Sequence, residues 1–222
     1  AAALADIHDR GIIHRDIKPG NIMVSAATGE LKLTGFGLAS QLEREQPSPG
    51  DPRLIAGTLA YMSPEQTGRM NRTVDSRTDL YSLGVTFYEM LTGELPFRSN
   101  DAMGYVHHHI ARAPRPLHEC TVDVPRPLSD IVMKLLAKMA EDRYQSATGL
   151  RLDLEICCAS WESIGQIAPF PLGAKDVSNQ FRLPQTLYGR ETEVRTLVSA
   201  FDRMVADRVR SLVLVAGYSG IG

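Results

Sequence analysis

Apolar residues recur at helical spacing in three stretches in the middle of the chain. Residues 77–92 carry a stripe of Leu80, Leu83, Phe87, Met90 and Leu91, followed by Gly93 as a stop signal. A second stripe consists of Leu128, Ile131, Val132, Leu135, Leu136 and Met139. A third helix is expected over residues 146–160. Because such stripes mark the buried face of a helix, this region is predicted to be mostly helical.

Short apolar runs elsewhere favour strands. Residues 22–24 and 31–33 flank a small and polar segment at 25–30, which predicts a β-hairpin. Near the carboxyl end, residues 191–205 follow a helical pattern. Residues 211–216 then form an apolar, partly β-branched run, typical of a buried strand in a parallel sheet.

Changes in composition divide the chain. Residues 42–53 are rich in Glu, Gln, Ser, Pro and Gly, which indicates a surface loop. In residues 164–184, prolines and a glycine interrupt any helix, and few apolar residues recur. We therefore expect a first domain at residues 1–160, a linker at 161–187 and the start of a second domain at 188–222.

Composition excludes several classes of protein. With 222 residues, 43% of them hydrophobic and 23% charged, the chain is typical of a soluble globular protein. Lys plus Arg number 24 against 26 Asp plus Glu, so the chain has no excess positive charge that would favour binding to nucleic acid. Three cysteines without zinc spacing, and no apolar run near about 18 residues, predict a cytoplasmic protein without a membrane segment. Because the chain begins at Ala1 inside an expected helix, we expect a fragment of a longer protein.

A loop before the first expected strand combines an acid, an ammonium group and an amide. It reads His14-Arg15-Asp16-Ile17-Lys18-Pro19-Gly20-Asn21. This loop resembles the catalytic loop of protein kinases, and Lys two positions after Asp is similar to the serine/threonine branch. The resemblance implies that Asp16 accepts the substrate hydroxyl's proton, that Lys18 offsets phosphoryl charge and that Asn21 holds Mg²⁺. Lys18 and Asn21 are thereby implied in ATP binding, and His14 and Arg15 in structural roles. The alternative is a loop whose Asp and Asn satisfy turn hydrogen bonds.

Further matches follow in the family's order. Residues 57–65, Gly-Thr-Leu-Ala-Tyr-Met-Ser-Pro-Glu, are similar to the end of a kinase activation segment. By resemblance, Thr58 approaches the catalytic acid, and Glu65 forms a buried ion pair with Arg143. Asp79 matches the acid that braces the catalytic-loop backbone. The resemblance covers residues 1–160 and implies the mainly helical C-lobe of a kinase.

Two departures from the family put catalysis in question. The chain has Gly35-Phe36-Gly37 where kinases have Asp-Phe-Gly, so a carboxylate that binds Mg²⁺ is missing. Asn21 alone, a neutral amide, would bind the ion weakly. No glycine-rich loop or strand lysine precedes Ala1, so the nucleotide-clamping N-lobe is expected to be absent from this chain. One alternative is therefore a pseudokinase, a regulatory binding module with impaired Mg-ATP chemistry. A one-base sequence error at Gly35 is another.

The carboxyl end carries a second phosphate-binding pattern. After the apolar run the chain reads Gly217-Tyr218-Ser219-Gly220-Ile221-Gly222. A strand opening into such a loop resembles the start of a Walker A motif, as in AAA-type P-loop ATPases. Backbone N–H groups at Gly217, Gly220 and Gly222 are then candidates to bind nucleotide phosphates. The alternative is a plain glycine turn.

Other candidate residues receive structural interpretations. His107, His108 and His109 diverge by about 100° each on a helix, so a solvated face is predicted rather than a metal site. Cys157 and Cys158 are predicted to be packing residues.

Together the patterns predict an α+β protein, with a kinase-like C-lobe, a linker and the opening of an α/β P-loop domain. The order of domains resembles that of large bacterial multidomain signalling kinases. The implied function is transfer of the ATP γ-phosphoryl group to protein Ser or Thr, with ATP and Mg²⁺ as cofactors and a protein substrate as partner. A third interpretation is an NTPase-driven signalling switch whose kinase-like part is only a sensor.

Overall fold

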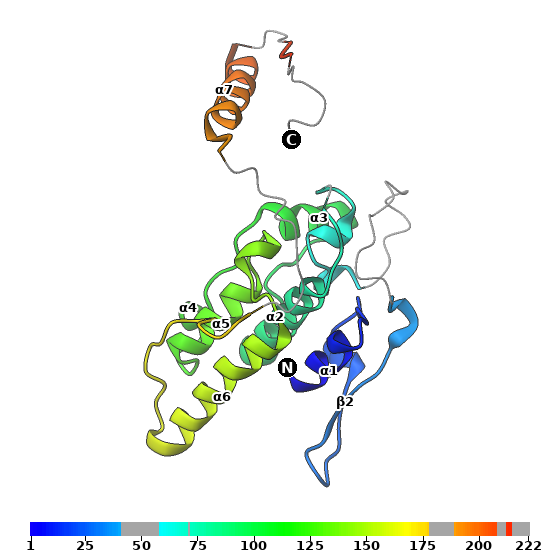
Figure 1. The fold of residues 1–222 in the computed structure, drawn as a ribbon, viewed down its shortest axis with the longest axis vertical. Helices are drawn as coiled ribbons and strands as arrows, with labels where there is room; N and C mark the ends of the chain where they lie inside the picture. The colour runs from blue at the N-terminus through cyan, green and yellow to red at the C-terminus, as the bar shows by residue number, and fades with distance from the viewer. Residues whose placement is uncertain (41–57, 71, 178–188, 208–211, 215–222) are drawn as a thin grey trace. The chain divides into compact units, whose positions relative to one another are not determined.

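The computed structural model describes residues 1–40, 58–70, 72–177, 189–207 and 212–214. The chain divides into two compact units, Ala1–Asn179 and Gln180–Gly222. In the first unit the described residues form helices and a two-stranded sheet (Figure 1). This mixture agrees with the α+β class predicted for the kinase-like part.

The first unit contains the helices and strands that the sequence pattern predicts, together with shorter elements that it does not. The α-helices are α1 (Ala2–Asp9), α2 (Arg77–Thr92), α3 (Ala102–Ala111), α4 (Leu117–Cys120), α5 (Arg126–Leu135) and α6 (Ala147–Ile164). The strands are β1 (Ile22–Val24) and β2 (Leu31–Leu33). Short 3₁₀ turns are η1 (Pro19–Asn21), η2 (Phe36–Leu38), η4 (Leu59–Tyr61), η5 (Glu65–Thr67) and η6 (Ala140–Asp142). The predicted hairpin and α2 are confirmed, whereas α5 ends earlier and α6 later than expected.

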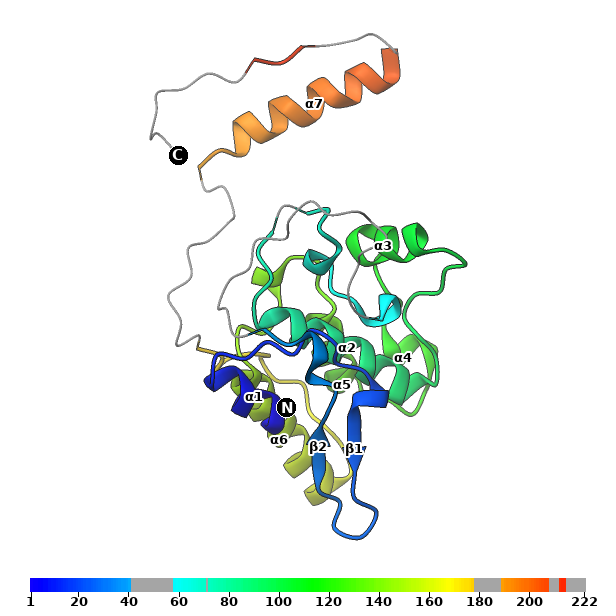
Figure 2. The same cartoon turned by 90° about the vertical axis from the view of Figure 1, so that its right-hand side faces the viewer.

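The hairpin β1–β2 follows the loop that carries Asp16. Its strands pair antiparallel, with Ile22 opposite Leu33. Gly29 allows the tight reversal because its φ is +69°, a conformation that costs glycine little. Three apolar side chains on the strands, Met23, Val24 and Leu31, are exposed to solvent. The hairpin therefore projects from the helices rather than lying within the core (Figure 2).

Helix α2 lies at the centre of the first unit, and α5 packs against it (Figure 1). Leu80, Tyr81 and Val85 of α2 are fully buried, and each such side chain stabilises the fold by about 1.5–3 kcal/mol. Gly84 permits the close approach, since a Cβ there would lie 2.7 Å from the Cβ of Leu135 in α5. This buried helix also carries Asp79, which holds the backbone of the loop before β1.

Residues 165–177, which we call the carboxyl-terminal strap, pack back on the first unit. Ile167, Phe170 and Leu172 are partly buried against the core that α1, α2, α5 and α6 share. The amide of Gly173 donates to Asp153 Oδ2 at 2.7 Å. The structure thus places the first part of the predicted linker 161–187 within α6 and the strap. The sequence pattern suggested a linker because the strap's prolines exclude a helix, but an irregular segment can still pack.

Asp176 attaches the strap to the start of α6. Its carboxylate accepts hydrogen bonds from the amide of Gln145 at 2.5 Å and from the amide and hydroxyl of Ser146 at 3.0 and 2.7 Å. Gly149 makes room for this carboxylate, because a Cβ there would lie 2.2 Å from Asp176 Oδ1. The strap is therefore bound through specific polar contacts as well as apolar ones.

In the second unit the described residues form helix α7 (Glu191–Asp207), which confirms the helix predicted there. The predicted strand at 211–216 is not found in its described part, because residues 212–214 adopt no strand. Gly217, Gly220 and Gly222, like the predicted loop at 42–53, lie outside the described residues. Among the helices described for both units, none is long and apolar enough to cross a membrane.

Candidate active site

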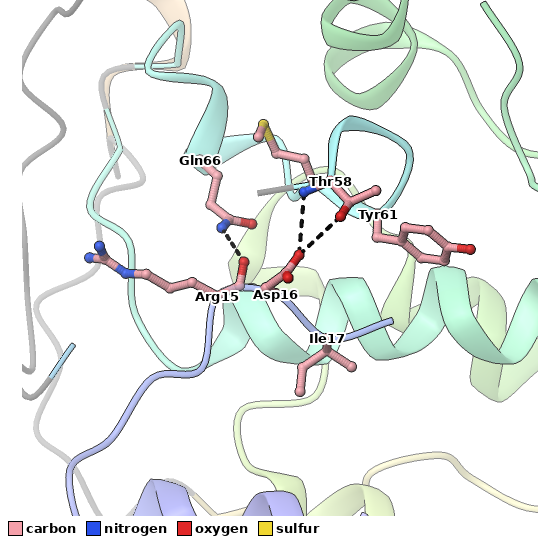
Figure 3. A pocket seen from close by; sticks show the side chains of 7 residues that line it. Arg15, Asp16, Ile17, Thr58, Tyr61 and Gln66 are labelled. Atoms are coloured by element: carbon pink, nitrogen blue, oxygen red, sulfur yellow. Dashed lines mark hydrogen bonds between the residues drawn. The ribbon is translucent and has the colours of Figure 1, made fainter. Parts of the chain in front are cut away.

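Asp79 of α2 anchors the backbone of the loop that precedes β1. Its carboxylate accepts from the amides of His14 and Arg15 at 2.8 and 2.7 Å, and Nε2 of His8 lies 2.9 Å away. Because Asp79 is fully buried, these donors replace the water that its charge would otherwise need. Arg15 has a φ of +67°, which few residues other than glycine adopt. The anchored loop turns the next residue, Asp16, toward Thr58 (Figure 3).

The carboxylate of Asp16 is the centre of a compact constellation. Its Oδ1 accepts from the amide and the hydroxyl of Thr58 at 3.3 and 3.2 Å (Figure 3). The Nζ of Lys18 lies 2.7 Å from Oδ2 and donates to the Thr58 hydroxyl at 2.6 Å. Nδ2 of Asn21 donates to Asp16 twice, to Oδ2 at 2.9 Å and to the backbone oxygen at 2.8 Å. The structure therefore brings together the four residues predicted to be catalytic.

The surroundings of Asp16 favour its charged form. Burial alone would raise the pKa of Asp16, but hydrogen bonds from Lys18 and Asn21 and the positive charge of Lys18 hold this pKa below its usual value. The group is therefore a carboxylate at neutral pH. It can accept a hydrogen bond, and then a proton, from a hydroxyl placed against it.

Glu65 and Arg143 form a buried ion pair beneath the site. Two hydrogen bonds of 2.7 and 2.9 Å join the guanidinium to the carboxylate, and the hydroxyl of Thr78 adds a third donor to Glu65 at 2.8 Å. Arg143 also donates to the carbonyl oxygens of Ala137, Lys138 and Arg77. Burial would raise the pKa of Glu65, but Arg143 lowers it below its usual value. The pair fixes η5, which follows Thr58 in the chain, to α2 and the segment before α6.

A pocket opens beside the carboxylate of Asp16. It is lined by Arg15, Asp16, Ile17, Thr58, Tyr61, Met62 and Gln66 (Figure 3). Gln66 links the Arg15 side of the pocket to the segment after Met62, since its Nε2 donates to the Arg15 carbonyl at 2.9 Å and its Oε1 accepts from the Ser63 amide at 3.0 Å. No sequence pattern marks Gln66, because only the folded chain brings it to the loop. The pocket has no room for a water molecule between its walls, so it marks how these side chains are grouped around the Asp16 carboxylate.

His109 differs from the prediction of a solvated histidine face. His107 is exposed, but His109 is buried, with its ring nitrogens 2.9 Å from the Tyr81 hydroxyl and 3.0 Å from the Leu59 carbonyl. Burial, followed by the charge of Lys138, lowers the pKa of His109 to about 4. A neutral His109 therefore joins α3 and α2 to η4, the turn after Thr58.

Asn21 is the one residue predicted to hold Mg²⁺, and this role stays a prediction. Gly35 supplies no side-chain ligand. Asn21 donates to Asp16 through Nδ2, whereas a metal ion would bind its Oδ1. Across the described ranges, no three His, Cys, Asp or Glu side chains are grouped to bind a metal. Because Mg²⁺ prefers several anionic oxygens, we assign no chemical step to a metal ion at these residues.

Comparisons with known proteins agree with this geometry. The family model "Protein kinase domain" matches residues 1–153. "Hybrid signal transduction histidine kinase G" of Dictyostelium discoideum is 39% identical over 194 residues, which cover 78% of this chain and 6% of that protein. "Serine/threonine-protein kinase PknB" of Mycolicibacterium smegmatis and of Mycobacterium tuberculosis are each 41% identical over 152 residues, 68% of this chain and 24% of theirs.

The chain therefore spans about a quarter or less of the length of these relatives. The family match covers more than half of the chain and contains the Asp16 loop, the Glu65–Arg143 pair and Asp79. From its fold, its catalytic-loop geometry and this match, the chain belongs to the protein kinase family.

Proposed function

We propose that the chain is part of a serine/threonine protein kinase, which transfers the γ-phosphoryl group of ATP to a Ser or Thr hydroxyl of a protein. One observation carries the proposal. The hydroxyl of Thr58 donates to Asp16 Oδ1 while it accepts from the Lys18 ammonium group. A substrate hydroxyl at this position would contact a base and a cation together. The names of the PknB relatives support Ser/Thr as the acceptor.

The proposed reaction uses these two side chains directly. Asp16 orients the substrate hydroxyl and takes its proton as the oxygen bonds to the γ-phosphorus of ATP. The bond from that phosphorus to the bridging oxygen of ADP breaks, and the Lys18 ammonium group stabilises charge on the phosphoryl oxygens. His14, Arg15, Asp79 and the Glu65–Arg143 pair act by positioning. Mg²⁺ normally accompanies ATP in kinases, and of residues 21 and 35 only Asn21 carries a side chain that could bind it.

The test is phosphate transfer to a generic Ser/Thr protein substrate by the natural protein that contains this chain. Asp16→Asn keeps the side-chain shape and is expected to lower transfer about 10²–10⁴-fold, the contribution of a positioned base. Asp130→Asn, at an exposed position on α5, is the matched control and should leave transfer unchanged. Equal transfer by wild type and Asp16→Asn would refute the role of Asp16.

A regulatory kinase-like module is the second candidate, and Gly35 favours it. Without a carboxylate at that position the site lacks a ligand that most kinases use for the metal of Mg-ATP. The retained helical core would then bind a partner protein without transferring phosphate. Wild-type protein that transfers no phosphate yet keeps its fold would favour this candidate over the first.

We further propose that residues 188–222 begin a P-loop ATPase domain, with Gly217, Gly220 and Gly222 at the phosphates. The glycine pattern and the helix α7 before it support this assignment. The Dictyostelium relative is named a hybrid signal transduction histidine kinase, which is compatible with a role in signalling. ATP binding at this end by a longer natural protein, lost in Gly222→Val, would support the domain. No loss would refute it.

A further inference from the structure

The turn η4 carries the residues that follow Thr58 past the carboxylate of Asp16. Thr58 contacts Asp16 Oδ1 through its amide and its hydroxyl. The amide of Tyr61, the last residue of η4, donates to the Thr58 carbonyl at 2.9 Å. The Tyr61 side chain lines the same pocket as Asp16 (Figure 3). Any shift of η4 therefore changes what lies against the Asp16 carboxylate.

Helices α2 and α3 both hold η4 through hydrogen bonds. The Tyr61 hydroxyl donates to Oε2 of Glu89 in α2, and both side chains are half-buried. Nε2 of His109 in α3 lies 3.0 Å from the Leu59 carbonyl oxygen, and His109 is only 1% exposed. Because water competes less with a hydrogen bond from a buried group, the His109 contact is expected to restrain the turn more strongly.

The groups that face the nitrogens of His109 fix where its ring carries a proton. The Leu59 carbonyl oxygen can only accept a hydrogen bond, so Nε2 must donate. Nδ1 is then the acceptor for the hydroxyl of Tyr81 in α2, 2.9 Å away. Burial and the charge of Lys138 oppose a second proton on the ring. His109 is thus a neutral imidazole that joins α2 to η4 in one defined tautomer.

Neighbouring rings hold the imidazole of His109 in place. The Phe97 ring meets it edge-on, with centroids 5.3 Å apart, and the Tyr105 ring stacks on it at 6.4 Å. The Lys138 ammonium group closes one side of this cluster. It lies 4.4 Å from the centre of the Phe97 ring and donates to the His108 carbonyl at 3.1 Å. The packing therefore fixes the direction of the Nε2–H bond.

We propose that His109 is a positioning residue for phosphoryl transfer, which acts by holding the Leu59 carbonyl through its Nε2–H group. The turn η4 then keeps Thr58 and Tyr61 against Asp16. The inference rests on the proposed function, in which Asp16 acts on a substrate hydroxyl. His109 acts through the backbone of η4 rather than on the reacting atoms. Its loss should weaken the placement of the protein substrate and leave the use of ATP unchanged.

The first test locates the ring proton of His109 in the wild-type chain. Long-range ¹H–¹⁵N spectra at neutral pH distinguish a ring nitrogen that carries a proton from one that does not. We expect the proton of His109 on Nε2, in slow exchange with water because the group is buried and hydrogen-bonded. The exposed ring of His107 should show fast exchange. A His109 proton on Nδ1, or one that exchanges as fast as that of His107, would overturn the proposal.

The second test makes the same substitution at two positions of α3. His109→Phe keeps a ring beside Phe97 and Tyr105 but removes the Nε2–H donor to the Leu59 carbonyl. In the natural protein that contains this chain, KM for the protein substrate should rise roughly 10-fold, as for one lost hydrogen bond in a buried site, while KM for ATP stays unchanged. His107→Phe, at an exposed position, should change neither constant.

His109→Gln serves as the rescue variant. Its side-chain amide can donate to the Leu59 carbonyl from the place of Nε2, so KM for the protein substrate should return most of the way to the wild-type value. A His109→Gln protein no better than His109→Phe would contradict the proposal. So would a His109→Phe protein with a lower kcat and both KM values unchanged, because that result would mean only that folded protein was lost.

Amide signals provide a readout that does not depend on turnover. In ¹H–¹⁵N spectra of the whole chain, the Thr58 and Tyr61 signals should shift in His109→Phe and stay in place in His107→Phe. Unshifted signals in a folded His109→Phe protein would contradict the proposal. Phosphate transfer that fails in every form of the protein would count against the proposed function alone. The ring proton of wild-type His109 would still decide this inference, because its measurement needs neither turnover nor a folded variant.

Discussion

The buried charges of Glu65 and Arg143 illustrate how single residues hold the site. Both side chains are removed from solvent and joined by two hydrogen bonds. Arg143→Met is expected to lower the free energy of unfolding by about 3–5 kcal/mol, because Glu65 stays buried without its partner. The double variant Arg143→Met/Glu65→Leu should recover most of that loss. Urea unfolding followed by circular dichroism checks this, and a double variant no more stable than Arg143→Met would contradict it.

His109 makes stability depend on pH in a defined direction. Its pKa falls from 6.5 in the unfolded chain to about 4 in the folded one, so between these values the unfolded state binds more protons. The contribution to stability is full above pH 6.5 and is lost as pH falls toward 4, by up to about 3 kcal/mol. Measured by unfolding at several pH values, the dependence of the free energy of unfolding on pH should be weaker in His109→Gln. The control His107→Gln, at an exposed position, should keep the pH dependence of the wild type. Equal slopes would refute the assignment.

At the scale of the residue, the spacing of residues predicted which side chains meet at the candidate site but not all of their contacts. Asp16, Lys18 and Asn21 are close in the chain, so their proximity followed from the loop itself. Gln66 and His109 reach the site from distant segments, and no local pattern marks them. Their roles depend on tertiary packing, which sequence periodicity does not encode.

Among the elements, α6 and the strap form a joint unit. Asp176→Ala removes the acceptor for three donors at the start of α6 and should lower the free energy of unfolding by about 1–3 kcal/mol. Lys175→Ala, at an exposed neighbouring residue, is the control and should have little effect. Chemical unfolding of both variants measures the difference. A loss below about 0.5 kcal/mol for Asp176→Ala would mean that water replaces these hydrogen bonds.

The elements themselves were largely predictable. The hairpin followed from two short apolar runs around a small, polar segment, and α2 followed from a helical stripe that ends at Gly93. Both signals are local. The end of α6 and the packing of the strap were not, since Pro169 and Pro171 indicate only that no helix continues. The strap is fixed by Gly149 and Asp176, and no local sequence pattern predicts that these two residues are in contact.

At the scale of the molecule, the first compact unit reaches Asn179 rather than residue 160. A chain that ends at residue 179 should keep the cooperative unfolding of the first unit, whereas one that ends at 160 should unfold at lower urea. The reason is that Ile167, Phe170 and Leu172 cover part of the core. Urea midpoints of the two proteins check this. Equal midpoints would show that the strap adds nothing to the stability of the unit.

The strap also has a consequence for how genes of this kind can recombine. Consider a recombination event that exchanges the downstream domain, with its breakpoint between codons 160 and 176. The helical core would then lose Asp176. The strap would be joined to a protein that has no surface on which it can pack. A breakpoint after codon 179 would carry the whole unit intact. Viable natural fusions and engineered chimaeras should therefore join on the carboxyl side of Asp176, even though the sequence looks like a free linker about fifteen residues earlier.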